Sequence, residues 1–268
     1  MKNAGTEEGI IEELNFVKCL NKEKSNNGIW NILSGSLRIE NLENHHAVHV
    51  TKKQISRLTG KEVWPKADLY IACGVIRPQY LVENSFVLDE GDIEEFKMRK
   101  IDFSGISVKR SDSTKYQILK MPPDTFCKLF GNYELGAGAS VFCKREDELP
   151  KNESVIRGWN TSWNNLFKYF ENHILEIQLI NDAREPPAHR IQIARKLKEY
   201  SISEIQNKIK NSQKLLDFIF KGVGNFDEPY TATWLYERGV FRKNKPSDFH
   251  VTTGSGRSHG DFTVVIKP

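Results

Sequence analysis

The segment 67–73 constrains this chain more than any other, because it predicts a buried strand with a carboxylate near its start. It is apolar apart from Asp68, and a proline stands three residues before that aspartate. A second short strand is predicted over 106–110, and it carries Lys109. If the two strands pair in one sheet, a carboxylate and an ammonium group lie side by side.

A carboxylate and an ammonium group on neighbouring strands can hold a divalent metal ion and a water beside a phosphodiester. Asp68 is the best placed metal ligand, and the main-chain carbonyl of Val108 is a second. Lys109 can orient the attacking water or neutralise the charge that develops on the phosphate. The alternative is that Asp68 is an ordinary polar residue at a strand edge and Lys109 a solvated one.

Size and composition set the outer limits. The chain has 268 residues, 38% of them hydrophobic and 28% charged, which favours a packed core over disorder. Its net charge of +4 is only mildly basic. We expect a nuclease core over 1–150 and a helical, DNA-binding part over 151–268, packed on that core or forming one domain with it.

The four cysteines show no metal-clamp spacing, and Cys73 and Cys143 are predicted to be small core residues. No apolar run reaches the ~20 residues of a membrane helix, and the N-terminus lacks an apolar secretory segment. We therefore expect a reduced, cytoplasmic protein without a membrane partner.

The remaining pattern alternates helices and strands. Helices are predicted over 7–20 and 125–130, the second capped by Asp124, with a helical turn over 52–58 that Gly60 closes. Short extended segments are expected at 47–50, 80–82, 85–88 and 116–121, and a loop or helix start at 89–95. Ser201 and Ser203 are candidate caps between helices over 191–200 and 202–220. Aromatic residues at helical spacing over 159–179 and a glycine-rich hairpin over 252–261, followed by a strand over 262–266, complete an α/β (α+β) pattern.

The segments 65–68 (Pro-Lys-Ala-Asp) and 107–109 (Ser-Val-Lys) resemble the motif of the PD-(D/E)XK nuclease superfamily, most closely its orthodox type II restriction endonucleases. The resemblance covers roughly the first 125 residues. It implies a mixed central sheet flanked by helices, a restriction-endonuclease-like core with a helical and C-terminal β-hairpin extension. It also implies that Asp68 binds the metal, that Ser107 occupies the second acidic position and that Lys109 is the motif lysine.

Ser107 departs from the pattern, since a serine supplies no charge to a metal. A helix before the sheet often contributes an acid in this family, so Glu13 is the first candidate for the missing carboxylate and Glu40 the second. A different pairing would use Asp89 or Glu90 as the metal carboxylate, although these stand in an acidic run that is more often solvated.

Two segments suit contacts with nucleic acid. The first follows Lys109 and combines cations with hydroxyl groups, including Arg110, Ser111 and Lys115. The second is the glycine-rich segment 252–261, where Arg257 and His259 stand among residues that let a backbone approach DNA closely. An ordinary hairpin is the alternative for the second segment.

His45, His46 and His49 form a cluster that would suit a metal if the segment were helical, but the local pattern is extended. An HNH-type nuclease arrangement is not evident around them. The sequence also lacks a P-loop, a dinucleotide glycine fingerprint and a nucleophile elbow.

The sequence therefore predicts a Mg²⁺-dependent, sequence-specific endonuclease that cleaves double-stranded DNA, a type II restriction enzyme. Cleavage of palindromic sites implies a homodimer. The family resemblance implies a prokaryotic cell that also contains a cognate DNA methyltransferase, though not as a bound partner. A DNA-binding protein with a decayed nuclease fold and a repair or mobile-element nuclease are the alternatives.

Overall fold

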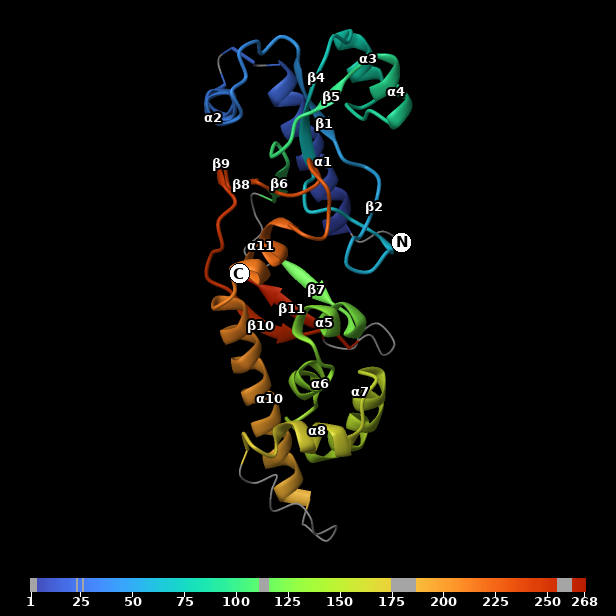
Figure 1. Ribbon diagram of the computed structural model, residues 1–268, viewed down its shortest axis with the longest axis vertical. Coiled ribbons are helices and arrows are strands. Elements are labelled where there is room, and N and C mark those ends of the chain that lie inside the picture. Colours follow the sequence, from blue (N-terminus) through green and yellow to red (C-terminus); the bar gives the residue numbers. More distant parts are fainter. Residues whose placement is uncertain (1–3, 23, 26, 111–115, 175–186, 255–261) are drawn as a thin grey trace. The chain divides into compact units, whose positions relative to one another are not determined.

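The computed structural model describes residues 4–22, 24–25, 27–110, 116–174, 187–254 and 262–268 (Figure 1). By its internal contacts the chain divides into two compact units. The N-terminal unit comprises 1–114 and 217–246, and the second unit comprises 115–216 and 247–268. These boundaries differ from the expected division at residue 150. The physical reason is long-range strand pairing, which joins residues 234–243 to the sheet of the N-terminal unit.

A six-stranded mixed sheet organises the N-terminal unit. Its order is β1–β4–β6–β8–β9, with β5 also paired to β4. β6 and β8 run parallel, and the other pairs are antiparallel. The strands are β1 His45–His49, β4 Leu69–Cys73, β5 Arg99–Lys100, β6 Ile106–Lys109, β8 Trp234–Glu237 and β9 Val240–Lys243. The strands predicted around 67–73 and 106–110 are thus confirmed, and they are direct neighbours.

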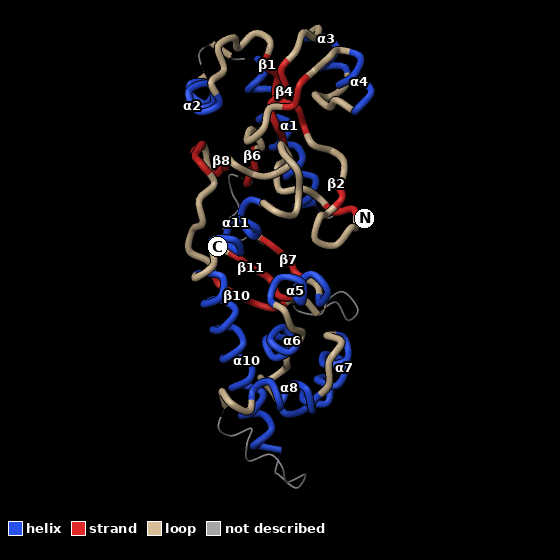
Figure 2. The backbone as a smooth tube through the Cα atoms, in the orientation of Figure 1, coloured by secondary structure: helices blue, strands red, loops and turns tan. Residues whose placement is uncertain are grey.

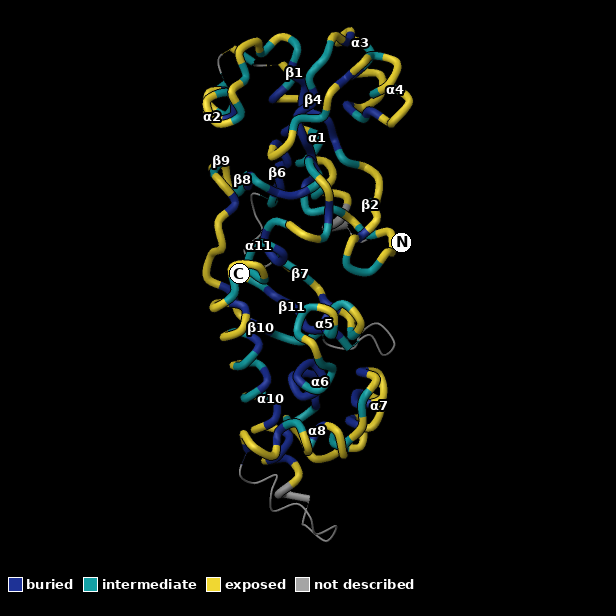
Figure 3. Tube along the Cα trace, in the orientation of Figure 1, coloured by how far each residue is buried: buried dark blue, intermediate teal, exposed yellow. Residues whose placement is uncertain are grey.

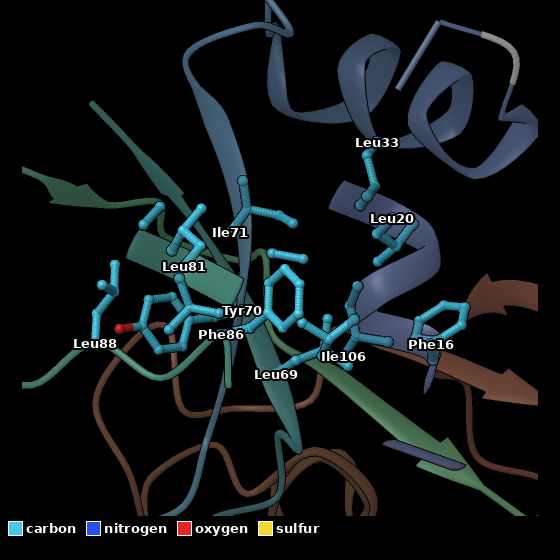
Figure 4. Close-up of a cluster of buried hydrophobic side chains, with 14 of the residues drawn as sticks. Phe16, Leu20, Leu33, Leu69, Tyr70, Ile71, Leu81, Phe86, Leu88 and Ile106 are labelled. Carbon is cyan, nitrogen blue, oxygen red and sulfur yellow. The ribbon is translucent and has the colours of Figure 1, made fainter. Parts of the chain in front are cut away.

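The core of this unit is apolar because β4 lies inside the sheet. Leu69 and Ile71 are fully buried, as is Ile106 on β6. They pack in one cluster with Phe16 and Leu20 of helix α1 (Ala4–Lys22), as Figure 4 shows. The expected helix over 7–20 is therefore confirmed, and its buried face covers the sheet. Helix α2 (Gly28–Leu37) adds Trp30 and Leu33 to the same cluster.

The expected helical turn over 52–58 is wrong. Its residues form a short hairpin of β2 (Gln54–Ile55) and β3 (Glu62–Val63), with Gln54 opposite Val63 and Ile55 opposite Glu62. A backbone hydrogen bond of 2.9 Å from Ser56 to the Lys61 carbonyl closes the turn. Strand pairing outweighs the weak helical propensity of so short a segment.

The two short strands expected at 80–82 and 85–88 are wrong, because 78–83 is helical and 84–89 is turn and coil, whereas the helix start expected at 89–95 is confirmed. Helix α3 (Pro78–Glu83) starts with a proline at its first position, which suits a helix N-terminus because proline lacks an N–H. Helix α4 (Glu90–Glu95) starts at Asp89, whose side chain and that of Asp92 each bond the other residue's backbone N–H. This reciprocal cap explains why the acidic run forms a helix.

The second unit combines a small sheet with a helical layer. Its antiparallel sheet has the order β10–β11–β7. Figure 2 distinguishes these strands from the surrounding helices. The elements are β7 Leu119–Met121, α5 Pro123–Phe130, α6 Glu134–Ser140, the 3₁₀ helix η1 Glu146–Lys151, α7 Asn152–Gly158, α8 Trp163–Phe170, α10 Pro187–Lys210, β10 His250–Thr253 and β11 Val264–Lys267. Helix α11 (Gln213–Lys221) crosses the boundary between the units.

Three expected helix caps in this unit are wrong. Asp124 lies inside the first turn of α5, whose cap residue is Pro122. Ser201 and Ser203 lie within the continuous helix α10. Ser201 is fully buried beside Gly138 of α6, where an added Cβ would lie 2.3 Å from the serine oxygen. This close helix crossing requires small residues, which explains a serine inside the helix.

Figure 3 shows which residues of each unit are buried and which are exposed. Cys73 and Cys143, expected in the core, are only half-buried. No helix among the described residues is both long and apolar enough to span a membrane.

His46 on β1 provides a pH test of the fold. Its pKa is lowered from 6.5 to about 4, mainly by burial and also by the nearby Lys24 ammonium, against a hydrogen bond with the Gly74 carbonyl. The folded protein therefore binds fewer protons than the unfolded chain between these values. The contribution of His46 to the free energy of unfolding is therefore fully present above pH 6.5. It falls by on the order of 3 kcal/mol as the pH drops towards 4.

Urea unfolding of wild type and His46→Gln across this range measures the effect, with the exposed His250→Gln as control. The variant should lose most of the pH slope. His45, whose pKa burial also lowers, contributes a remainder of the same sign. Equal slopes for all three proteins would contradict the assignment.

Candidate functional site

Asp68 lies where three strands of the N-terminal sheet meet. Its backbone N–H donates to the Ile106 carbonyl at 2.8 Å, and its own carbonyl accepts from Val50 at 2.9 Å. Its side chain continues this pairing, since Oδ2 accepts the backbone N–H of Val108 at 2.7 Å. The carboxylate thus bonds to β6 just beyond Leu69 and Ile106, the last directly paired residues of β4 and β6.

A chain of hydrogen bonds connects Asp68 to Lys109. The Ser107 hydroxyl donates to Asp68 Oδ2 at 3.0 Å, and Lys109 Nζ donates to Ser107 Oγ at 2.6 Å. Ser107 and Lys109 share one face of β6 because strand side chains alternate, while Ile106 and Val108 face the core. Ser107 is only 4% exposed, so this chain is held in place by its surroundings.

Glu13 of α1 joins the site from a distant part of the sequence. Its Oε2 lies 3.3 Å from His49 Nε2 at the end of β1, and its side chain is 23% exposed. Burial raises the pKa of Glu13, the His49 hydrogen bond lowers it, and the Asp68 carboxylate raises it. The Lys109 ammonium also lowers this pKa, so Glu13, Asp68 and Lys109 act on one another electrostatically.

Lys66 brings a second amine to the site. Its pKa is lowered to about 7, mainly by burial and also by the Lys109 ammonium, while the Asp68 carboxylate opposes both effects. Its stem packs against Gly222, where a Cβ would lie 2.7 Å from Lys66 Cγ. Gly222 also has φ +79°, so two constraints favour glycine beside this lysine. The site thus contains two carboxylates and two amines within one sheet end.

Arg110, a predicted DNA contact, is half-buried and pairs with Glu8 of α1 at 2.8 Å. The other four predicted DNA contacts lie outside the described residues. They are Ser111, Lys115, Arg257 and His259.

The alternative metal carboxylates named from the sequence lie or pair elsewhere in the structure. Glu40 is exposed in the bend after α2. Asp89 caps α4, and Glu90 pairs with Lys100 at 2.6 Å. The charges of Asp68 and Lys109 both act on the pKa of Glu13.

The three histidines lie on strand β1, so they lack the helical spacing that a shared metal would need. His45 contacts the Asn41 carbonyl at 2.5 Å and His46 contacts the Gly74 carbonyl at 3.2 Å. His49 faces Glu13 instead.

The donor set of the site suits a hard cation with few protein ligands. Among the described residues, no group of three or more His, Cys, Asp or Glu side chains is placed to hold a metal ion. Mg²⁺ commonly needs only one or two carboxylates beside waters and phosphate oxygens. Asp68 and Glu13 supply carboxylates. The Val108 carbonyl points to the same side of β6 as its N–H, which bonds Asp68.

Comparisons of this chain with family models, with curated proteins and with solved structures found no match. The interpretation of the site therefore depends on its own geometry.

Sequence reasoning missed the roles of Lys66 and His49. Lys66 stands two residues before Asp68, and this spacing could have placed both side chains on one strand face. The contact between His49 and Glu13 joins residues 36 apart in sequence and carries no local signal.

Asp68 should also stabilise the fold. Asp68→Ala leaves the buried Val108 N–H without its acceptor and should cost about 1–3 kcal/mol. Asp68→Asn keeps an acceptor oxygen and should cost less. Urea unfolding of both variants tests this, with the exposed Asp102→Ala as control. Equal stability of the two Asp68 variants would show that the bond to Val108 is dispensable.

Proposed function

We propose that this chain is a Mg²⁺-dependent endonuclease that cleaves double-stranded DNA at specific sequences, with a restriction-endonuclease-like core. The observation that carries the proposal is the hydrogen-bonded chain of Asp68, Ser107 and Lys109 at one end of the mixed sheet, whose charged groups also act electrostatically on Glu13. These residues come from three distant segments. Solvated surface charges do not need to lie close together in a half-buried place. Phosphodiester hydrolysis, in contrast, requires carboxylates and an ammonium group near one another.

Asp68, Glu13 and the Val108 carbonyl would hold the cation. A bound Mg²⁺ supplies a water of lowered pKa and neutralises charge on the phosphate. The protein's contribution is position, since Asp68 is fixed to β6 through Val108 and Ser107. A ligand fixed before binding loses little freedom when the cation arrives.

Lys109 would orient the attacking water or stabilise the charge on the scissile phosphate. Ser107 positions it, because the Lys109 amine donates to the serine oxygen at 2.6 Å. Lys66 adds a second amine beside the same carboxylate, which favours an anionic substrate at this place. Glu13 supplies the charge that Ser107 lacks relative to the family motif.

A DNA-binding protein with a decayed nuclease site is the second candidate. It is favoured by one observation, that Asp68 Oδ2 already accepts two hydrogen bonds from the protein. This candidate requires salt-dependent DNA binding without cleavage. A repair or mobile-element nuclease would cut without sequence preference. A homodimer acting on palindromic sites, with a methyltransferase as a separate protein of the same cell, belongs to the leading proposal.

Digestion of phage DNA with Mg²⁺, with Ca²⁺ and with EDTA tests the proposal. We expect discrete fragments with Mg²⁺ only, and at least an about 100-fold slower reaction for Asp68→Asn and Lys109→Met. Lys18→Met, an exposed lysine of α1, is the matched control. Smears or nicks would favour the repair class. A shifted but uncut substrate would favour the decayed site.

Metal binding can be measured apart from cleavage. A cation that binds the folded protein raises its unfolding temperature. We expect Mg²⁺ or Ca²⁺ to raise the Tm of wild type and of Glu40→Gln but not of Asp68→Asn or Glu13→Gln. The opposite behaviour of the two glutamate variants would assign the second carboxylate to Glu40.

A further inference from the structure

The β2–β3 hairpin presents an exposed face with an aromatic residue at its edge. Strand alternation places Ile55 and Glu62 on one face, and extends that face to Lys53 and Trp64. All four are exposed, while Gln54 and Val63 on the other face are half-buried. Ile55 is 69% exposed and Trp64 is 61% exposed. The other four tryptophans are buried or half-buried, so Trp64 is exceptional.

The charge around this face is mainly positive. The segment 52–64 contains four cations and one carboxylate, Glu62. Lys52, Lys53 and Lys61 are exposed, and the exposed Arg57 pairs with Asp227. Lys53 shares the exposed face with Ile55 and Trp64, whereas alternation places Lys52 and Lys61 on the other face of the hairpin. A hairpin that combines exposed apolar side chains with lysines is complementary to nucleic acid, whose phosphates meet the cations and whose sugars and bases meet the apolar groups.

The hairpin is firmly anchored to the N-terminal unit. The Ser56 hydroxyl donates to the Asn225 side chain at 2.5 Å, and the Arg57 backbone N–H donates to the Asn225 carbonyl at 2.8 Å. Thr59 donates its backbone N–H to Ser56 Oγ at 3.0 Å. The exposed side chains therefore stand on a fixed backbone.

The same anchor contacts the candidate site. Asn225 belongs to the turn that begins at Gly222, and Gly222 packs against the stem of Lys66. Trp64 also precedes Lys66 by only two residues and Asp68 by four. The hairpin and the site are thus linked both along the chain and through this turn.

We propose that the β2–β3 hairpin is a DNA-contacting element that binds the DNA strand next to the scissile phosphate. Trp64 packs on a sugar or base, and the lysines contact flanking phosphates. This inference rests on the proposed function, because it takes the DNA bound at Asp68 as the occupant of the hairpin face. A protein partner or a second copy of this chain would also cover Ile55 and Trp64, but neither explains the excess of cations in the hairpin.

Binding of a short labelled duplex in EDTA, where no cleavage occurs, tests the contact. We expect Trp64→Ala to bind about ten-fold more weakly, as for loss of one aromatic stacking contact. Phe103→Ala is the matched control, because Phe103 is 60% exposed in the same unit. DNA should also quench tryptophan fluorescence in wild type, and Trp64→Phe should abolish the quenching.

The outcomes distinguish a failure of the hairpin inference from a failure of the proposed function. If wild type binds DNA but Trp64→Ala binds equally well and no quenching occurs, the hairpin inference fails while the proposed function stands. If wild type binds no DNA, both fail. If Trp64→Ala instead changes the mass in sedimentation, the face joins two copies of this chain and the inference is overturned.

Salt dependence gives a second, independent measurement. Each lysine on a phosphate adds about one to the slope of log affinity against log salt. We expect the double variant Lys53→Ala and Lys61→Ala to lower this slope by about two. Lys18→Ala should leave it unchanged. An unaltered slope in the double variant would remove the hairpin from the DNA interface.

Discussion

Asp68 sets the geometry on which the N-terminal sheet and its candidate site both depend. Its backbone bonds the segment after β1 on one side and β6 on the other, and its carboxylate bonds Val108 where the direct pairing of β4 and β6 has ended. A side-chain oxygen thus replaces a backbone acceptor. The strands can separate there without leaving the Val108 N–H unsatisfied. This separation lets Ser107 donate to the same carboxylate and carry the connection on to Lys109.

Four charged groups in a half-buried place are expensive unless they compensate one another. Glu13 and Asp68 repel each other, as do Lys66 and Lys109, and the attractions between the two kinds oppose both repulsions. Burial works against every charge, and it is the largest cause of the shifts at both Glu13 and Lys66. Apolar residues at these positions would stabilise the fold at least as well as the four charges do. A bound cation and phosphate would complete it.

The sequence predicted the strands β4 and β6 and the helix α1, because each follows from a local apolar pattern. It also predicted Asp68 and Lys109 on neighbouring strands, and their hydrogen-bonded connection through Ser107 follows from that pairing. It failed where tertiary contacts decide. Residues 52–58 form a strand pair through partners across a turn, and 80–82 is helical although its residues favour strands. The pairing of β8 with β6 joins residues more than a hundred positions apart, and no local pattern records it.

The serine at position 107 is consistent with this charge balance. An acid there would place a third carboxylate against the two amines, within hydrogen-bond reach of Asp68. Like charges so close in a half-buried site raise each other's pKa values and favour the neutral forms. Glu13 already carries a raised pKa beside one carboxylate. A hydroxyl at position 107 keeps Lys109 in position without adding charge, so the second carboxylate can come from α1.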